Sequence, residues 1–226
     1  MRTVPLCFKR VAPARIEPNY IHHTQEASTN VGAFCMLGHG PTFRPSKNTP
    51  MPIRRPFDLK GWIEENRDLL KPPVGNKNLY TESGDYIVMI VGGPNARKDY
   101  HLNETEELFY QVEGDIEVGI QEDGQAVTIP IREGEMFLLP ANMPHQPRRG
   151  PNTVGLVIEC KREDREMQDG LQWYCEKCNN LLHEYRFVLH NIEKDFIPRF
   201  REFYGSETLR TCSKCGHVME TDPRFV

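Results

Sequence analysis

The 226-residue sequence contains no run of apolar residues that approaches membrane-spanning length, so we expect no membrane anchor. It begins without the apolar segment of a secretory signal. Basic residues are not in excess, because 28 Lys and Arg stand against 32 Asp and Glu, a formal net charge of -4. This balance argues against a general nucleic-acid binder, which normally carries a basic face.

The composition is that of an ordinary soluble protein, with 38% hydrophobic and 27% charged residues. The length suits one sizeable domain, or one domain with appendages, that folds without disulfide bonds. Before its first acidic residue, Glu17, the chain carries basic charges alone, which is a weak feature of mitochondrial presequences. Residues 11–18 do not form an amphipathic pattern, so we expect a cytoplasmic protein, with mitochondrial targeting as the alternative.

Four cysteines near the end of the sequence form two C-x2-C pairs: Cys175 with Cys178, and Cys212 with Cys215. Each pair directs two sulfurs to a common point, and together they complete the tetrahedron that zinc or a mononuclear iron prefers. A closed shell of four cysteines leaves no position for substrate, so we expect a structural or redox-active site. Disulfides are the less favoured alternative, since paired C-x2-C turns suit metals.

The sequence pattern divides the chain into three parts. Residues 1–52 contain many prolines and little periodicity, so we expect an irregular arm there. Residues 53–168 form a β domain, and residues 169–226 form a small metal-binding region. Between the two cysteine pairs, residues 182–204 are predicted to be mostly helical or mixed.

One helix and several strands are predicted in the central part. Apolar residues recur at roughly helical spacing across 57–70, Asp58 is suited to the N-cap, and Pro72 and Pro73 end the helix. Runs rich in Val, Ile, Phe and Tyr then alternate with turn residues, as in a sandwich or barrel. These predicted strand runs cover 86–93, 107–121, 125–131, 134–140 and 154–160.

Two histidines and one carboxylate in the β region form a second candidate metal site, made of His101, Glu107 and His145. Such a set leaves several coordination positions open, the arrangement that non-haem Fe(II) uses for dioxygen and chelating substrates. In an alternating strand Glu107 shares a face with Phe109, whereas Glu106 faces the opposite way. We therefore expect Glu107 to line the interior.

The spacing of these residues resembles the two cupin motifs, which belong to a double-sheet β barrel. The matching positions are His101, Asn103, Glu107, Gly114, Gly134, Pro140 and His145. Asn103 stands where many cupins have another histidine ligand, which implies three protein ligands. Asn142 replaces a usual glycine and can adopt the left-handed conformation of that turn. The resemblance implies a mainly β fold, a cupin double-stranded β-helix (jelly-roll barrel) with a small four-cysteine appendage.

A closer resemblance is to the 3-hydroxyanthranilate 3,4-dioxygenases of the kynurenine pathway. It is carried by the blocks LLKPPVGN, VGGPNARKDYH, EELFYQVEG, FLLPANMPHQPRR and LVIE, and by a rubredoxin-like CEKC and CSKC. The resemblance implies Fe(II) at the barrel site and oxidative ring cleavage of 3-hydroxyanthranilate by O2. The product would be 2-amino-3-carboxymuconate semialdehyde, the precursor of quinolinate in NAD biosynthesis. The resemblance also implies a homodimer.

The resemblance further implies roles for four other residues. Arg97 and Arg149 match the arginines that hold the substrate carboxylate, and Glu159 matches an acid near the substrate's amino and hydroxyl groups. A guanidinium can engage a carboxylate with two parallel hydrogen bonds. Glu159 and Arg97 are thus the candidate catalytic groups, and Asn76 matches a loop residue that approaches the pocket. Arg148 in place of Arg149, and Glu159 as a surface acid, remain open alternatives.

Two functions from different classes fit the sequence. The first is a ring-cleaving Fe(II) dioxygenase with a remote four-cysteine site that holds iron or zinc. The second is a non-enzymatic cupin that binds a small acid or a metal, because fold alone does not determine chemistry. Arg97, Arg149 and Glu159 favour the enzyme, since a mere binding barrel has no need of that set around an open iron site.

Overall fold

The computed structural model describes residues 53–71, 75–82, 84–95, 97–162, 166–190 and 192–226. The predictions for the arm, residues 1–52, lie outside this part of the chain. The described residues belong to one compact unit. Among the described residues no helix is both long and apolar enough to cross a membrane.

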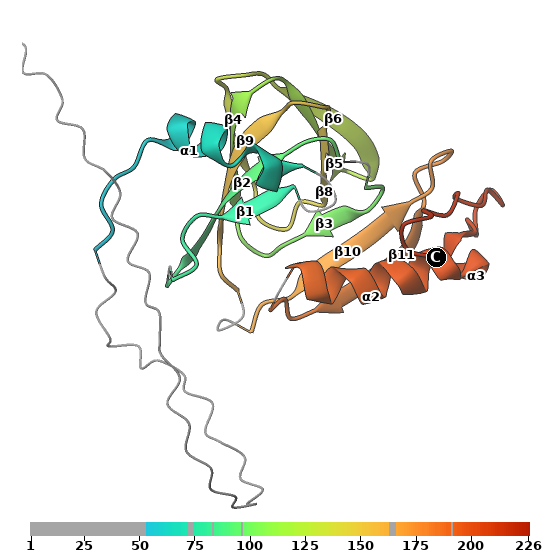
Figure 1. The fold of residues 1–226 in the computed structure, drawn as a ribbon. Helices are drawn as coiled ribbons and strands as arrows, with labels where there is room; N and C mark the ends of the chain where they lie inside the picture. The colour runs from blue at the N-terminus through green and yellow to red at the C-terminus, as the bar shows by residue number, and fades with distance from the viewer. Residues whose placement is uncertain (1–52, 72–74, 83, 96, 163–165, 191) are drawn as a thin grey trace, which may run out of the picture. The chain divides into compact units, whose positions relative to one another are not determined.

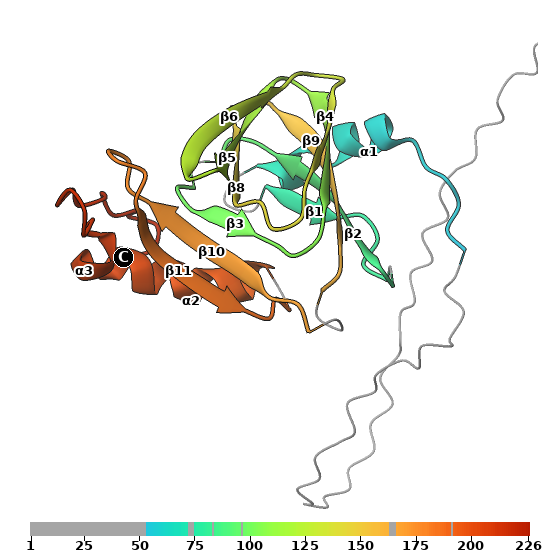
Figure 2. The same ribbon diagram turned by 180° about the vertical axis from the view of Figure 1, so that it is seen from behind.

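The unit is built on two antiparallel sheets (Figures 1 and 2). The five-stranded sheet has the order β1 (Asn76–Asn78), β2 (Tyr86–Gly92), β9 (Val154–Cys160), β4 (Glu107–Glu113) and β7 (Met136–Leu139). The six-stranded sheet has the order β11 (Leu181–Phe187), β10 (Asp169–Tyr174), β3 (Tyr100–Leu102), β8 (His145–Arg149), β5 (Ile116–Glu122) and β6 (Gln125–Ile131).

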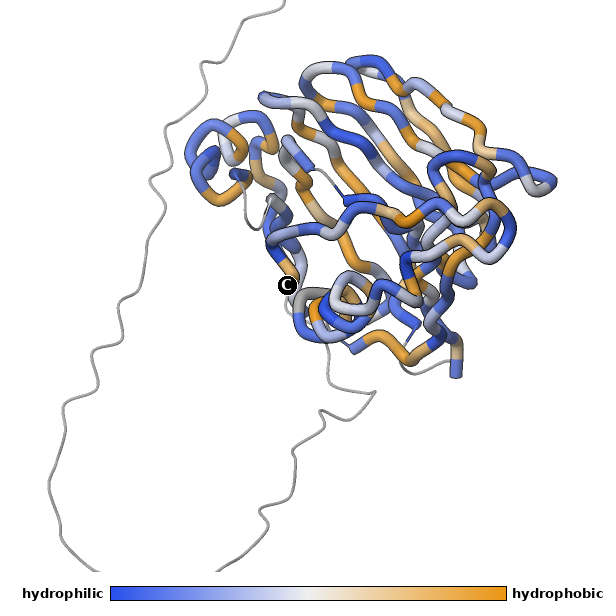
Figure 3. Tube along the Cα trace, turned by 90° about the vertical axis from the view of Figure 1, so that its right-hand side faces the viewer, coloured by the Kyte–Doolittle hydropathy of each residue, from blue (hydrophilic) through white to orange (hydrophobic). Residues whose placement is uncertain are grey.

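The main core lies between the two sheets. Phe109 and Val157 from the first sheet pack with Val118 and Ile120 from the second, and all four are buried. Along the strands hydrophobic and hydrophilic positions alternate (Figure 3), as expected when one face of each strand is buried. Glu107, the first residue of β4, is buried, and Glu106, directly before the strand, is exposed, so the prediction for the two adjacent acids is confirmed.

The predicted helix over 57–70 is shorter in the structure. The helix α1 (Leu59–Glu65) begins after Asp58, whose side chain accepts a hydrogen bond from the Lys60 N–H, as predicted for an N-cap. It ends at Asn66, whose side-chain amide donates to the carbonyl of Trp62. A 3-10 helix, η1 (Arg67–Leu70), follows. The continuous helix was therefore wrong in its second half, because the Asn66 amide binds the last turn and tightens the chain there.

Most strands rich in β-branched residues were predicted, and the shorter or more polar ones were not. The predicted runs correspond to β2, β4, β5, β6, β7 and β9. The run 107–121 divides at Gly114, which has a φ of 64° and forms the turn between β4 and β5. Strands β1, β3, β8, β10 and β11 were missed, because β1 and β3 are only three residues long and the other three contain charged or amide residues without a long apolar run.

The C-terminal segment extends the barrel instead of standing apart from it. Strand β10 pairs with β3, and β11 pairs with β10. Two helices follow, α2 (Ile192–Gly205) and α3 (Glu207–Arg210), so the mixed structure predicted for 182–204 is confirmed. Trp173 of β10 is stacked on Phe203 of α2, with ring centroids 4.2 Å apart. The regions 53–168 and 169–226 therefore share one sheet.

Trp173 is fully buried in this aromatic cluster and is the residue that ties α2 to the sheet. We expect Trp173→Ala to lower the free energy of unfolding by about 3–5 kcal/mol, because it removes a large buried ring and leaves a cavity. Denaturant unfolding with a probe of secondary structure measures the change. Met136→Ala, at a side chain that is 64% exposed, is the control and should change stability little. Equal losses in the two variants would contradict this role of Trp173.

Candidate active site and metal centres

Two pairs of polar residues face the barrel interior from opposite sheets. His101 of β3 and His145 of β8 are register partners in one sheet. Glu107 of β4 and Glu159 of β9 are register partners in the other sheet. The ligand atoms of His101, Glu107 and His145 all lie within 4.8 Å of one another. The structure thus brings together the three predicted metal ligands.

The contacts of His145 and Glu107 suit a shared cation. Nδ1 of His145 lies 3.1 Å from the carbonyl oxygen of Met143 and must donate to it, because a carbonyl only accepts. The neutral ring then presents the lone pair of Nε2, which lies 3.1 Å from Oε2 of Glu107. Two acceptors at this distance require a proton or a metal ion between them. This donor set is the one that non-haem iron prefers.

The charges in the interior are strongly coupled. Burial raises the pKa of Glu107, but the charge and hydrogen bond of His145 outweigh it, so the pKa lies below its usual value. Burial lowers the pKa of His145, but Glu107 outweighs it and the pKa is raised. Burial, and then the charge of Glu107, raise the pKa of Glu159. The Glu107–His145 pair therefore favours a positive charge between its two groups, which a bound metal cation would supply.

Asn103 occupies the position at which the cupin motif has a further histidine. Its side chain is fully buried, and its amide donates to Oε2 of Glu107 at 3.1 Å and to Oε2 of Glu159 at 3.4 Å. The amide therefore connects two carboxylates, and His101, Glu107 and His145 are the three candidate ligands that remain. Its own oxygen has no hydrogen-bond partner among the described residues.

Arg149 is a buried cation that has no carboxylate partner among the described residues. Its side chain donates from Nη1 to the amide oxygen of Gln111 at 3.1 Å, while Nε has no partner among the described residues. Burial lowers the pKa of Arg149 to about 10, although Glu107 opposes the shift. Gly155 makes room for the guanidinium, because a Cβ there would lie 2.7 Å from Nη1. An anionic ligand would satisfy both the free donor and the unpaired charge.

Arg97 is held from two sides. Nε donates to Oδ1 of Asp99 at 2.9 Å, and the second nitrogen pairs with the other carboxylate oxygen. The guanidinium also lies over the rings of Phe196 and Phe200 of α2, 5.2 Å from each centroid. Burial lowers the pKa of Arg97, but Asp99 outweighs it and the pKa is raised. The helix that follows the first cysteine pair therefore positions Arg97.

A cavity of about 120 Å³ lies over the candidate metal ligands and has room for one small organic molecule. Arg148 does not line it: its side chain is 42% exposed and bonds to Gln146 and to the hydroxyl of Tyr100. All seven predicted barrel residues line the cavity: Asn76, Arg97, His101, Glu107, His145, Arg149 and Glu159.

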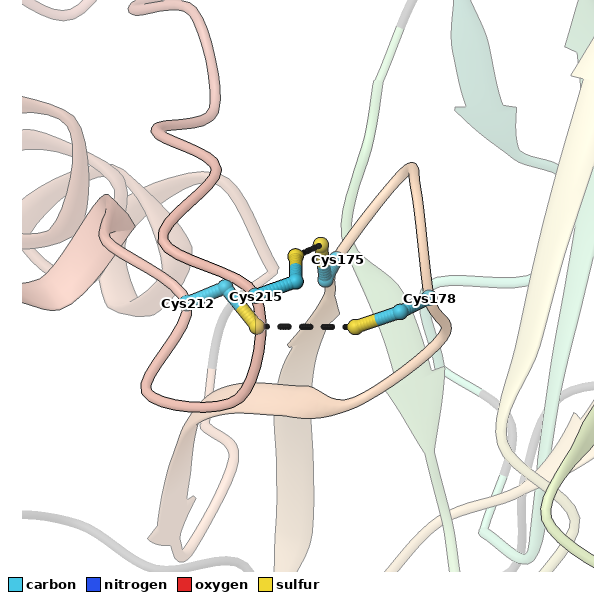
Figure 4. Close-up of side chains that lie close together, drawn as sticks. All are labelled: Cys175, Cys178, Cys212 and Cys215. Atoms are coloured by element: carbon cyan, nitrogen blue, oxygen red, sulfur yellow. Dashed lines mark hydrogen bonds between the residues drawn. The ribbon is translucent and has the colours of Figure 1, made fainter.

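The four cysteines converge on one point (Figure 4). Sγ of Cys175 lies 3.6 Å from Sγ of Cys215, and Sγ of Cys178 lies 3.6 Å from Sγ of Cys212. Sulfurs at about 2.3 Å from a tetrahedral metal lie about 3.8 Å apart, whereas a disulfide needs about 2.05 Å. The spacing therefore fits a metal, and the described cysteines are free of disulfides.

The two C-x2-C turns have the same backbone geometry. In the first, the N–H of Asn179 donates to the carbonyl of Cys175, and in the second, Gly216 donates to Cys212. The residue after each second cysteine is left-handed, with φ values of 55° at Asn179 and 71° at Gly216. Asn and Gly are the residues that adopt this conformation most readily. Backbone donors from Cys215 and Lys214 lower the pKa of Cys212 to about 6, although burial opposes them.

Several residues that shape the site were missed in the sequence. Asp99 and Phe196 hold Arg97, and Gln111 holds Arg149. Asp169 accepts a hydrogen bond from His101, and Arg162 binds Asp169 and Glu159. Phe109 and Gln111 share the inward face with Glu107, so alternation could have indicated Gln111. The others carried no such signal.

The structure and the site now define a class of protein. Two antiparallel sheets around a two-histidine, one-carboxylate cluster, with a four-cysteine site after them, are the features of a metal-binding protein of cupin type. A family model described as 3-hydroxyanthranilic acid dioxygenase matches residues 51–204. The chain belongs to this family, so the predicted family, fold class and dioxygenase activity class are confirmed.

Two curated relatives match this chain over most of their own length. A protein of Xanthomonas campestris pv. campestris named 3-hydroxyanthranilate 3,4-dioxygenase is 54% identical over 170 residues, which cover 75% of this chain and 95% of the relative. A protein of Bacillus thuringiensis with the same name is 44% identical over 164 residues, or 72% of this chain and 90% of the relative. Among solved structures, a cupin-2 domain containing protein from Shewanella frigidimarina is 19% identical, covers 43% of this chain and 91% of its own, and has a TM-score of 0.37.

The first prediction from the site concerns the barrel metal. Glu107→Gln should remove the metal from the barrel, because an amide is a weaker ligand and no longer balances the charge of the cation. The four-cysteine metal should remain. Glu106→Gln is the matched control, since Glu106 is the exposed residue that directly precedes β4. Metal analysis of the purified proteins checks both, and a Glu107→Gln protein with full barrel metal would refute the assignment.

The second prediction concerns the four-cysteine site. Cys215→Ser should lower the metal content by about one atom per chain and destabilise the helical segment α2–α3, because metal binding in such sites is coupled to folding. Since Phe196 and Phe200 hold Arg97, the variant should also bind substrate more weakly while the barrel keeps its metal. Metal analysis, hydrogen exchange over α2 and substrate binding measure the three effects. Ser213→Ala, at an exposed position between the two cysteines, is the control.

Proposed function

We propose that the chain is an Fe(II)-dependent 3-hydroxyanthranilate 3,4-dioxygenase that opens the substrate ring with O2 to give 2-amino-3-carboxymuconate semialdehyde. One observation supports this most directly. The cavity over His101, Glu107 and His145 is also lined by the buried guanidinium of Arg149, which makes no ion pair among the described residues and whose Nε has no partner there. A small acid that can chelate a metal satisfies both features at once.

The three ligands suit Fe(II), since two imidazoles and one carboxylate are its common facial set. When bound there, Fe(II) would supply open positions at which the substrate's amine and hydroxyl chelate and O2 is activated next to the ring. The chain's own residues orient the ring. Phe109 lies beside His145, with ring centroids 6.2 Å apart, and closes the cavity with Val157 and Met89.

The carboxylate of the substrate binds the two arginines. Arg149 gives the stronger contact, because its free Nε and its unpaired charge gain most from an anion in a buried site. Arg97 is already paired with Asp99 and contributes from the more open side, where its side chain is 34% exposed. The two cations thus determine which end of the substrate faces away from the metal.

Glu159 takes the proton of the substrate hydroxyl as that group becomes a ligand. Burial and the charge of Glu107 raise the pKa of Glu159, which makes it a better base near neutral pH than an ordinary carboxylate. Its position opposite Glu107 in the sheet places it beside the metal ligands. Asn103 and Arg162 donate hydrogen bonds to its carboxylate.

The remaining parts of the proposal follow from the family. The four cysteines hold iron or zinc, which contributes to folding and not to oxygen chemistry. The enzyme is a cytoplasmic homodimer that acts in tryptophan degradation through the kynurenine pathway, toward quinolinate and pyridine nucleotides. These statements rest on the relatives and on the sequence, and the two metals can be identified by metal analysis of the native protein.

The test uses the full chain loaded with Fe(II) without oxygen. Addition of 3-hydroxyanthranilate and then O2 should give ring opening, followed by absorbance and mass. Arg149→Ala should raise KM or lower kcat/KM by roughly ten- to a hundredfold with iron retained, because a charge-assisted contact to a carboxylate is worth about 1.5–3 kcal/mol. Arg148→Ala is the matched control.

The outcomes separate enzyme from binding protein. Loaded protein that binds 3-hydroxyanthranilate but never consumes O2 would indicate a non-enzymatic cupin. A silent Arg149→Ala together with a damaging Arg148→Ala would show that the carboxylate site had been assigned to the wrong arginine.

A further inference from the structure

Arg162 lies where the chain leaves β9 for β10, between the two sheets, and its side chain is 2% exposed. Nε donates to Oδ2 of Asp169 at 3.1 Å and Nη2 donates to Oδ1 at 2.7 Å, a bidentate pair. Nη1 donates to Oε2 of Glu159 at 2.8 Å. One guanidinium therefore binds two buried carboxylates that belong to opposite sheets.

Asp169 connects this pair to the metal centre. Its side chain is fully buried, and its Oδ1 accepts a second hydrogen bond, from Nε2 of His101, at 2.7 Å. That bond engages one ring nitrogen of His101 and leaves the other, Nδ1, with its lone pair. A carboxylate that accepts from the second nitrogen of a metal-binding histidine orients the ring and makes it a stronger ligand.

Stability alone is a weak explanation for this cluster. Removing a guanidinium and two carboxylates from water costs free energy that their attraction repays only with good geometry, and apolar residues often do as well. Here every nitrogen of Arg162 has an acceptor, and each carboxylate it holds reaches a group of the site. Asp169 reaches His101, and Glu159 lines the cavity.

We propose that Arg162 is a positioning residue for both halves of the site: through Asp169 it orients the metal ligand His101, and directly it orients Glu159 toward the substrate. The bidentate geometry is essential, because a lysine ammonium is a compact point charge that cannot serve Asp169 with two bonds and also reach Glu159. The Glu159 half rests on the proposed function, whereas the His101 half concerns metal binding alone.

The first experiment measures the affinity of the barrel for Fe(II). The full-chain variants Asp169→Asn and Arg162→Lys are titrated anaerobically against a competing chelator, and four-cysteine occupancy is measured in the same samples. Both should bind barrel Fe(II) roughly 10- to 100-fold more weakly, the usual effect of losing such an outer partner. Asp169→Asn keeps the shape of the side chain, so it tests the proposal even if Arg162→Lys folds poorly.

The control is Arg186→Lys. Arg186 lies on β11 opposite Gly170, pairs with Glu184, and has a side chain that is 40% exposed. Its replacement should leave the Fe(II) affinity and the turnover unchanged. Wild-type Fe(II) affinity in both Asp169→Asn and Arg162→Lys would overturn the proposal, since neither residue would then act on His101.

The second experiment is a double-mutant cycle at saturating Fe(II). Arg162→Lys should lower kcat about tenfold or more in the wild-type background, and should cause no further loss once Glu159→Gln is present. Equal losses in both backgrounds would show that Arg162 does not act through Glu159, and would overturn that half. If the wild type does not turn over 3-hydroxyanthranilate, the proposed function fails, and the Fe(II) affinities still decide the inference.

Discussion

The site depends on one constraint, the antiparallel register of two strand pairs. His101 stands opposite His145 in one sheet, and Glu107 stands opposite Glu159 in the other. A slip of one residue in either pair would turn a whole strand over and send its polar residue to the outer face. Phe109 and Val157 oppose such a slip, because they share the inward faces of β4 and β9 and would leave the core with it. Packing of the core therefore fixes the positions of these four polar residues relative to one another.

Among the described residues the buried arginines of the interior are paired with carboxylates, and Arg149 is the exception. Arg162 is paired with Asp169 and Glu159, and Arg97 with Asp99. Within the described residues Arg149 makes no ion pair, although its side chain is buried. A buried charge without a partner costs several kcal/mol and persists where a ligand completes it.

The sequence was sufficient to predict the candidate metal ligands, but not the residues that hold them in place. Glu107 was predictable because strand alternation separates it from Glu106, and the cysteine spacing predicted a site whose sulfurs do converge. Arg162 and Asp169 lie in a densely charged stretch, residues 161–169, that resembles a solvated loop. Their burial depends on the crossing from one sheet to the other, which no local pattern encodes. Strand β8, with the sequence HQPRR, was not predicted either, because no local pattern in its sequence indicates its place in the sheet.

The position of β3 has a consequence for the order in which the molecule is assembled. This strand of three residues carries His101 and pairs only with β8 and β10 among the described strands. Both partner strands come much later in the chain. The sheet contacts of His101 are therefore made with residues that are distant in the sequence. Closing such long loops is slow compared with forming the local β5–β6 hairpin. We therefore expect His101, the first of the three candidate metal ligands to be synthesised, to be the last of them to reach its final place.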